Sequence, residues 1–251
     1  SATSIAENSG STLTLTATSS VVADEDITVS ISTSGTATEG TDYGTISDIT
    51  ISAGATTGTA TFDPTDDSIS DVAETAAVAI SAVSGADATE SGTQSVTITI
   101  NDNESTPTIT LAVSATSIAE NAGSSLTLTA TSSIASGSDI TVSLGTGSTA
   151  TEGTDYGSVS DITISAGATT GTTTFTPTDD SMYETSTNET AIISIDGVSG
   201  GSAAEDGTQS VTITITENES APTVTLAVSS TSIAENAGSS LTLTATLSGT
   251  T

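Results

Sequence analysis

Hydrophobic and polar residues alternate along this chain with a period of two, and small turn-forming residues interrupt the alternation at short intervals. Between residues 107 and 221, Ile, Leu, Val, Phe or Ala lies on one side of each segment and Thr or Ser on the other. This pattern is typical of strands with one buried face, and nothing has the period of a helix longer than a turn. It predicts strands at residues 108–114, 125–131, 139–144, 158–164, 170–176, 190–195 and 209–215.

Short strands separated by turn residues indicate an all-β protein. Seven strands in about 110 residues are the pattern of an antiparallel Greek-key sandwich of the immunoglobulin-like type. Residues 165–168 and 197–200 contain Gly, which supplies the positive φ of tight turns, and are predicted to be hairpin connections. The fold class predicted here is therefore a seven-stranded β-sandwich.

The same block of sequence occurs twice and begins a third time. TSIAEN starts at Thr3, Thr116 and Thr231, and TEGTDYG starts at Thr38 and Thr151, an offset of 113 residues. GTQSVTITI recurs at residues 92–100 and 207–215, an offset of 115, so the second copy has two extra residues, just before Glu189. This period is too long for a solenoid unit and fits a small domain repeated in tandem.

The repeat predicts three segments joined by short connections. They are repeat 1 (residues 1–106, without the start of its first strand), repeat 2 (residues 107–221) and the start of repeat 3 (residues 222–251). Pro107 and Pro222 lie in the joints, where proline ends a strand and keeps the connection extended. Two strands cannot bury a sandwich core, so we expect the segment to belong to a longer array. Strand exchange, with residues 223–228 of one subunit filling the first-strand gap of the next, is the alternative expectation.

Charge narrows the classes of partner. The chain has 31 acidic residues, no Lys, Arg or His, and a net charge of −31. Nucleic acid and anionic membrane surfaces are excluded as direct partners, because both are bound through Lys or Arg. The chain has no Cys, so disulfides and thiolate metal sites are excluded as well. No side chain of this protein can neutralise a carboxylate by forming a salt bridge.

The acidic residues gather at strand ends and in loops that are predicted to converge on one pole of each sandwich. In repeat 1 they are Glu7, Asp42, Asp66, Asp67, Asp71, Glu74, Asp102 and Glu104, and in repeat 2 they are Glu120, Asp155, Asp179, Asp180, Glu184, Glu189, Glu217 and Glu219. Two carboxylates ~5 Å apart repel by roughly 3 kcal/mol at an effective dielectric of about 20. Either the side chains spread apart as a solvated polar end, or a cation lies among them. Oxygen ligands without His or Cys suit Ca²⁺.

Four motifs in this order resemble the Calx-beta domain. They are Ile-Ala-Glu-Asn, Gly-Thr-Asp-Tyr, Asp-Asp-Ser followed by further acids, and Val-Thr-Ile-Thr-Ile with an acidic run before a Pro-containing joint. The resemblance covers both full copies and the start of the third. It implies seven-stranded sandwiches of the kind found in sodium/calcium exchangers, in integrin subunit β4 and in large bacterial surface and secreted proteins.

In the calcium-binding members of that family, the ligands come from these same motif positions. The resemblance therefore implies that the sixteen acids are Ca²⁺ ligands, with one to three ions per repeat. The last-strand run departs from the family pattern of three Asp, and the two-residue insertion could move Glu189 away from the set. Asp42 and Asp155 have a second interpretation as turn formers. Tyr43, Tyr156, Phe62 and Phe175 are interpreted as core residues rather than binding platforms.

Three functions from different classes remain open. The first is a calcium-rigidified structural spacer of an extracellular or cell-surface repeat protein, such as an adhesin, a matrix component or a filament. Its partners are then neighbouring repeats of the same chain, or other copies of the protein in a filament or matrix. The second is a calcium sensor coupled to a membrane partner, and the third is a carboxylate-based glycosidase. Aromatic residues make up only 2% of the chain and each acid set lies beside a joint, which favours the mechanical, non-catalytic role.

Overall fold

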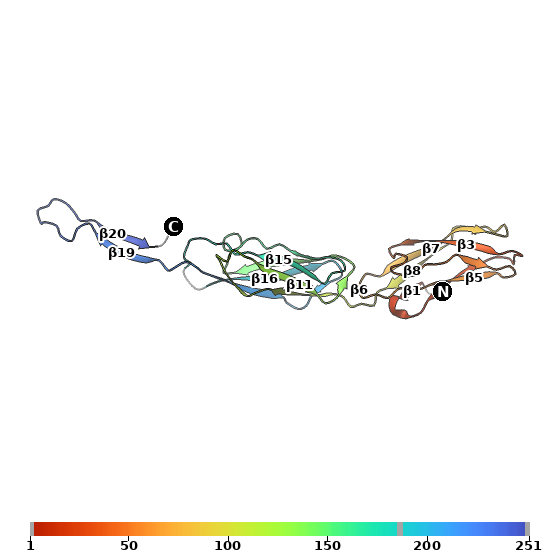
Figure 1. Ribbon diagram of the computed structural model, residues 1–251. Coiled ribbons are helices and arrows are strands. Elements are labelled where there is room, and N and C mark those ends of the chain that lie inside the picture. Colours follow the sequence, from red (N-terminus) through yellow and green to blue (C-terminus); the bar gives the residue numbers. More distant parts are fainter. Residues whose placement is uncertain (1–2, 185–187, 249–251) are drawn as a thin grey trace.

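The computed structural model describes residues 3–184 and 188–248, and it is built from β-strands. Figure 1 shows the repeats arranged in line, end to end, with repeat 1 at one end and the start of repeat 3 at the other. Within the described ranges the one helical segment is a single 3₁₀ turn, η1 (Glu7–Ser9). None of the described helices has the length and hydrophobicity needed to cross a membrane.

Each full repeat is a sandwich whose larger sheet has five strands. In repeat 1 this sheet has the order β1-β8-β7-β3-β4, and in repeat 2 the order β10-β18-β16-β13-β14. The strands are β1 (Ser4–Ala6), β3 (Ile27–Gly35), β4 (Ile49–Ile51), β7 (Glu74–Ser84), β8 (Ser95–Asn101), β10 (Ser117–Ala119), β13 (Ile140–Ser148), β14 (Ile162–Ile164), β16 (Glu189–Ser199) and β18 (Ser210–Thr216). The main pairs are antiparallel, but the short strands β1 and β10 run parallel to β8 and β18.

The second sheet of each sandwich is smaller. In repeat 2 it has the order β15-β11-β9-β17, and in repeat 1 it consists of β2 and β5. Its strands are β2 (Leu13–Thr18), β5 (Thr57–Phe62), β9 (Thr108–Val113), β11 (Leu126–Ser132), β15 (Thr170–Phe175) and β17 (Ala204–Glu205). The start of repeat 3 is a hairpin of β19 (Thr223–Val228) and β20 (Leu243–Ser248), with the same pairing as β9 and β11.

The structure confirms the fold class and locates each of the seven strands predicted for repeat 2, with two corrections. The strand predicted to begin at Ser158 begins at Ile162, because residues 157–161 form an irregular segment next to the Asp155 turn. The connection predicted at residues 197–200 was wrong, because β16 continues to Ser199 and the turn follows at Gly200. A register shift between Ser143 and Leu144 lets that long strand stay paired across the bulge.

The core of each repeat contains one stacked aromatic pair, formed by residues that the sequence predicted to be packed inside the domain. Tyr43 stacks on Phe62 with ring centroids 4.8 Å apart, and Tyr156 stacks on Phe175 at 4.7 Å. All four rings are buried, with at most 1% of their surface exposed. Ile, Val, Leu and Ala from both sheets surround the rings, and Thr and Ser of the same strands face solvent, which is the alternation expected of a sandwich.

A short β-bridge connects repeat 1 to repeat 2, in addition to the covalent joint. Strand β6 (Ile69–Ser70) belongs to repeat 1, strand β12 (Ala135–Ser136) belongs to repeat 2, and the two pair in parallel. The β6 label in Figure 1 lies where the two repeats meet. Both serines of the bridge are buried. The end of repeat 1 that carries β6 therefore faces repeat 2.

We predict that the aromatic pair is a main source of stability in each repeat. Phe175→Ala leaves a cavity beneath Tyr156 and should destabilise repeat 2 by about 3–5 kcal/mol. Thr174→Ala is the matched control, because Thr174 is exposed on the same strand, and it should change stability by less than about 0.5 kcal/mol. Urea unfolding of the full chain measures both. Equal effects of the two substitutions would contradict the assignment.

Candidate metal centre

Three separate segments bring acidic side chains to the end of repeat 1 that faces repeat 2. β1 runs parallel to β8 with Ile5 opposite Ile100, so η1 follows β1 beside the point where β8 ends. The segment between β5 and β7, which contains β6, crosses the same end of the sandwich. The parallel pairing of β1 with β8 therefore places Glu7, which follows β1, next to Asp102 and Glu104, which follow β8.

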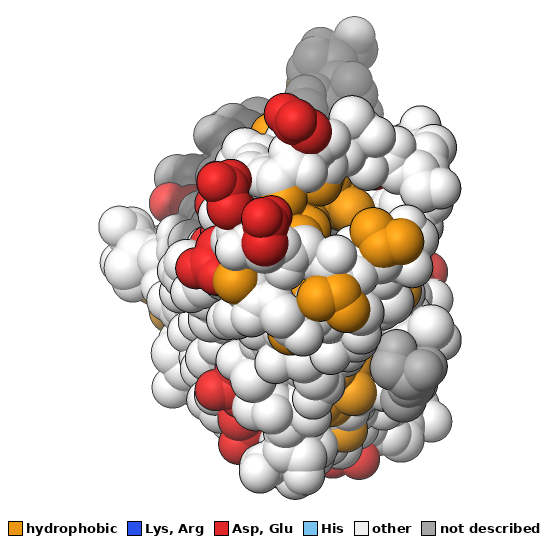
Figure 2. Space-filling view, turned by 90° about the vertical axis from the view of Figure 1, so that its right-hand side faces the viewer, with side chains coloured by type: hydrophobic (Ala, Val, Ile, Leu, Met, Phe, Trp, Pro, Cys, Tyr) orange, Lys and Arg blue, Asp and Glu red, His pale blue; other side chains and the backbone are white. Residues whose placement is uncertain are grey.

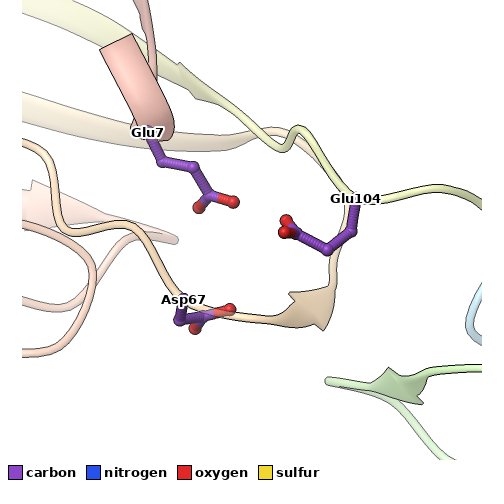
Figure 3. Close-up of side chains that lie close together, drawn as sticks. All are labelled: Glu7, Asp67 and Glu104. Carbon is purple, nitrogen blue, oxygen red and sulfur yellow. The ribbon is translucent and has the colours of Figure 1, made fainter. Parts of the chain in front are cut away.

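Glu7, Asp67 and Glu104 form the first group of carboxylates. Each contributes an oxygen that lies within 4.8 Å of the others. Figure 3 shows Glu7 at the start of η1, Asp67 in the loop before β6 and Glu104 beyond β8, around a common space. The N–H of Ile69 donates to Oδ1 of Asp67 at 2.7 Å, and this hydrogen bond holds the Asp67 carboxylate in place. The group thus unites residues that are far apart in the sequence.

Asp42, Asp71 and Glu74 lie together beside this group. The carboxyl groups of Asp42 and Glu74 share a hydrogen bond, and Asp71 and Asp67 are close enough to raise the pKa of Glu74. The N–H of Thr38 donates to Oδ2 of Asp42 at 2.6 Å, so Asp42 shapes its own turn as well as facing the acids. The turn-former interpretation and the presence of Asp42 in the cluster are therefore compatible.

Asp102, which follows β8, forms a hydrogen bond with the segment that contains β6. The N–H of Asp71 donates to Oδ2 of Asp102 at 3.1 Å. A hydrogen bond with Glu7 lowers the pKa of Glu104, but Asp102, burial and the nearby charge of Asp66 together raise it above its ordinary value. All eight acids predicted for repeat 1 therefore belong to one end of the sandwich.

Repeat 2 contains two corresponding groups. Glu120, Glu217 and Glu219 have oxygens within 4.8 Å of one another, and so do Asp155, Glu184 and Glu189. Glu189 pairs with Ile215 in the ladder in the same way that Glu74 pairs with Ile100, so the insertion does not move it away. The expectation that the extra residues displace Glu189 is wrong because the insertion precedes the strand and leaves its register unchanged.

Asp179 and Asp180 lie at the margin of these groups. Asp179 lines a shallow hollow together with Glu120. Asp180 is close enough to Glu184 to raise its pKa, and its Oδ1 accepts the N–H of Met182 at 2.6 Å, as Asp67 does with Ile69. Asp67 and Asp180 thus form the same turn, but Asp67 belongs to the closest group of repeat 1, whereas Asp180 lies outside both closest groups of repeat 2.

Burial and neighbouring carboxyl groups raise the pKa of one Glu in the group of Glu7, Asp67 and Glu104, and of one Glu in the group of Glu120, Glu217 and Glu219. Burial, followed by the hydrogen bond with Glu104, raises the pKa of Glu7 to about 8. Burial, followed by the hydrogen bond with Glu219, raises the pKa of Glu120 to about 8 in repeat 2. A proton on each Glu relieves part of the repulsion that its neighbours create.

The groups at the start of β7 and β16 respond in the same direction. Burial and the nearby charge of Asp42 raise the pKa of Glu74 to about 7. Burial and the charge of Asp155 raise the pKa of Glu189 to about 7. Each pole therefore contains at least two carboxyl groups that ionise with difficulty near neutral pH.

Glu217 behaves in the opposite way. Burial alone raises its pKa, but backbone N–H groups of Glu219 and Glu184 donate to its carboxylate and lower the pKa to about 2. These bonds measure 2.9 Å from Glu219 and 2.7 Å from Glu184. Glu217 is thus held ionised among neighbours that tend to be protonated.

Some carboxylate oxygens at the poles lack any hydrogen-bond partner among the described residues. They are buried and comprise Glu7 Oε1, Glu104 Oε2, Glu189 Oε2 and Glu219 Oε2. A buried, unpaired charged oxygen is costly unless a proton or a cation satisfies it. The donor set consists of carboxylate oxygens, so it fits a hard cation such as Ca²⁺ better than a transition metal.

Sequence reasoning missed the role of the asparagine between the two last-strand acids. Nδ2 of Asn103 donates to Glu104 at 2.7 Å, and Nδ2 of Asn218 donates to Glu219 at the same distance. The backbone N–H of Asn218 also donates to Glu120 at 3.3 Å. The signal was the recurrence of Asn at this one position in both copies. These amides orient the carboxylates toward the shared space.

Comparison with known proteins gives one family and several distant structures. The chain resembles the crystal structure of the calcium binding domain CBD12 of CALX1.1, at 15% identity and a TM-score of 0.36, over 76% of each chain. It also resembles the adhesin InvE of Yersinia pseudotuberculosis, at 14% identity and a TM-score of 0.37, over 85% of this chain and 56% of that chain. The D0-D1 domain of intimin matches at 16% identity and a TM-score of 0.29, over 85% and 95%.

No curated protein matches the chain. The model of the Calx-beta domain family matches it twice, at residues 1–104 and again at residues 102–219. Those two matches cover the segments in which the four motifs recur and in which the acids converge on one pole. The protein therefore belongs to the Calx-beta domain family, of which it contains two domains in tandem.

Proposed function

We propose that this protein is a calcium-binding, calcium-rigidified spacer. The observation that carries the proposal is the convergence of carboxylates, some with unpaired buried oxygens, in a chain without a single Lys, Arg or His. No internal group can neutralise the poles, so an external cation or protonation must do so. Membership of the Calx-beta family supports calcium as that cation, since the motif positions are those of the family's calcium-binding members.

Each pole would hold its ions through acids from different chain segments. In repeat 1, Glu7, Asp67 and Glu104 would form one site, and Asp42, Asp71 and Glu74 the other. In repeat 2, the groups Glu120, Glu217, Glu219 and Asp155, Glu184, Glu189 would do the same. When bound, Ca²⁺ supplies positive charge that attracts all of these oxygens together.

Cross-linking of these segments is what would make the protein stiff. The acids of the first group come from η1, from the loop before β6 and from the end of β8. The end of β8 leads directly into the joint at residues 105–107, and β6 contacts the next repeat. Fixing the acids therefore fixes both the covalent joint and the contact surface beside it.

A non-catalytic role fits the surroundings of the acids. A glycosidase of this type would need exposed aromatic platforms for sugar, but Tyr43, Phe62, Tyr156 and Phe175 are at most 1% exposed and belong to the core. The fifth aromatic residue, Tyr183, is 38% exposed, but repeat 1 has Ser70 at the matching position, so the two poles share no aromatic platform. The same acids also recur next to a domain boundary in each copy. We therefore assign the protein to an extracellular or cell-surface repeat protein, such as an adhesin, matrix component or filament, in which neighbouring repeats are its first partners.

We predict that calcium stabilises the folded chain well beyond the effect of ionic strength. A ligand that binds only the folded state adds about 3 kcal/mol per site at a hundredfold excess over Kd. Millimolar Ca²⁺ should therefore raise the melting temperature, measured by circular dichroism, while NaCl of equal ionic strength should raise it much less. Superimposable melting curves in calcium, sodium and chelator would remove calcium from the proposal.

We predict that calcium also lengthens the particle. Small-angle scattering of the full chain should give a longer and narrower distance distribution with Ca²⁺ than with chelator. Asp66→Asn with Asp67→Asn should shift this transition to at least about tenfold higher calcium, because ligand charge sets the affinity of such sites. Asp24→Asn with Glu25→Gln, which removes the same charge from an exposed loop, should not shift it. A calcium-independent distribution in the unsubstituted chain would exclude stiffening.

We predict that, as the pH rises, the melting temperature in chelator falls and the gain in melting temperature from calcium grows. The folded-state pKa values of Glu7 and Glu120 are about 8, above the ordinary value of 4.5, so folding favours their protonated forms. In chelator the stability that this provides is fully present below about pH 4.5 and is lost as the pH rises toward about 8. Calcium competes with the protons, so the calcium-induced gain in melting temperature should grow over the same interval. The lowered pKa of Glu217 acts only below this window. A chelated melting temperature that is constant or rises between about pH 5 and pH 8 would contradict the assignment.

A further inference from the structure

One peptide group connects the acidic pole of repeat 1 to repeat 2. The N–H of the Ser70–Asp71 peptide donates to Oδ2 of Asp102 at 3.1 Å. The carbonyl of the same peptide accepts the N–H of Gly137 in repeat 2 at 3.2 Å. The two bonds leave opposite sides of one rigid planar unit. The position of the last-strand acid is thereby linked to a loop of the neighbouring repeat.

Gly137 lies where a side chain would collide with the acidic pole. A Cβ on Gly137 would overlap the carboxylate of Asp71. The backbone of Gly137 does not have a positive φ, so the conformation of the loop does not require glycine. A side chain at this position would therefore require the Asp71 carboxylate to move from the place that it occupies beside Gly137.

Residues 20–26 of repeat 1 correspond to residues 133–139 of repeat 2. The two loops have the same conformation but expose different side chains. In both copies a Ser hydroxyl donates within the loop, from Ser19 to Val21 at 2.8 Å and from Ser132 to Ile134 at 2.7 Å. The Asp that ends the loop accepts an N–H from the facing turn at 2.8 Å in both copies. Asp24, Glu25 and Asp87 of repeat 1 are replaced by Gly137, Ser138 and Ser202, whereas Ser91 is replaced by Asp206.

A paired exchange of small residues accompanies the loss of acids. Ser136 of repeat 2 replaces Ala23 of repeat 1, and Gly201 replaces Ala86. A Cβ on Gly201 would overlap the hydroxyl of Ser136, which is buried and accepts the N–H of Ser138 at 3.2 Å. Residues 133–138 of repeat 2 are thus uncharged, and the loop is closely packed at the point where it meets repeat 1.

The end of repeat 1 that points away from repeat 2 lacks these features. Figure 2 looks onto that end, where acidic and hydrophobic side chains are exposed side by side. Val21 and Val22 are 68% and 61% exposed there, and Asp24 and Glu25 are exposed as well. An acidic pole of the kind formed by Asp67, Asp71 and Asp102 would meet like charge on this surface.

We propose that residues 133–139 of repeat 2 form a specific docking surface for the acidic pole of the preceding repeat, and that Gly137 determines its fit. The loop contributes a neutral backbone donor to the Ser70–Asp71 peptide and leaves space for the Asp71 carboxylate. The homologous loop of repeat 1, residues 20–26, cannot replace it, because its Asp and Glu would face those carboxylates. The residues at the two ends therefore decide whether a repeat packs against the acidic pole of the repeat that precedes it.

Hydrogen exchange in the full chain tests this docking. In the unsubstituted protein the N–H of Gly137 should exchange roughly three- to tenfold more slowly than that of Asp24, after correction for intrinsic rates, because a net hydrogen bond is worth about that factor. Gly137→Asp with Ser138→Glu, which installs the residues of repeat 1, should abolish this difference in chelator. The variant should still fold, since repeat 1 carries these residues in the same loop conformation.

Asp24→Gly with Glu25→Ser is the matched control and should leave the exchange of the Gly137 N–H unchanged. The proposal is overturned if the doubly acidic variant protects residue 137 as well as the original chain does, or if Gly137 and Asp24 exchange equally fast from the start. The result is separable from the proposed function. Calcium stiffening without protection at Gly137 would reject only the docking surface, and protection at Gly137 without any calcium effect would reject only the calcium spacer.

Discussion

Repulsion among carboxylates at one end of each sandwich is the constraint on which the rest of this structure depends. Oxygens of Glu7, Asp67 and Glu104 lie within 4.8 Å of one another, so their carboxylates repel one another when they are ionised. The chain has no cationic side chain to offset this repulsion. The high pKa values of Glu7 and Glu120 show the alternative remedy, which is to keep a proton. A cation would serve all of the oxygens at once.

The sandwich provides the framework that withstands this repulsion. Stacked pairs such as Tyr156 and Phe175, with the aliphatic residues around them, hold the two sheets together away from the pole. The parallel pairing of β10 with β18 then forces Glu120 to lie beside Glu217. Stability from the hydrophobic core thus allows an end that is unfavourable by itself, which is a frequent arrangement at functional sites.

The two repeats have similar interiors and different ends. Opposite the bulges of β7 and β16, the backbone N–H groups of Ile31 and Leu144 donate to the carboxylates of Asp48 and Asp161, each at 3.0 Å. The loops at residues 20–26 and 133–139 differ in charge, with three acids in the first and one in the second, and the second meets the acidic pole of repeat 1. The core and the contact between the repeats therefore depend on different residues.

The sequence by itself predicted most of the strands and the repeat, because alternation is a local property of the chain and recurring motifs can be read directly from it. It also predicted the buried Tyr43 and Phe62. It misplaced the end of β16, since Gly197 resembles a turn residue yet lies in a strand whose pairing with β13 continues through it. The hydrophobic pattern around Gly197 carries no information about which strand pairs with it.

Only the tertiary structure decided how the acids divide into groups and what the neighbouring repeat does. Glu189 remains beside Asp155 because the ladder with β18 fixes its register, whatever the length of the preceding loop. Gly137 looked like an ordinary loop glycine in the sequence. Its role depends on the approach of Asp71 from another domain, and contacts between segments so distant in the chain are set by packing rather than by local propensity.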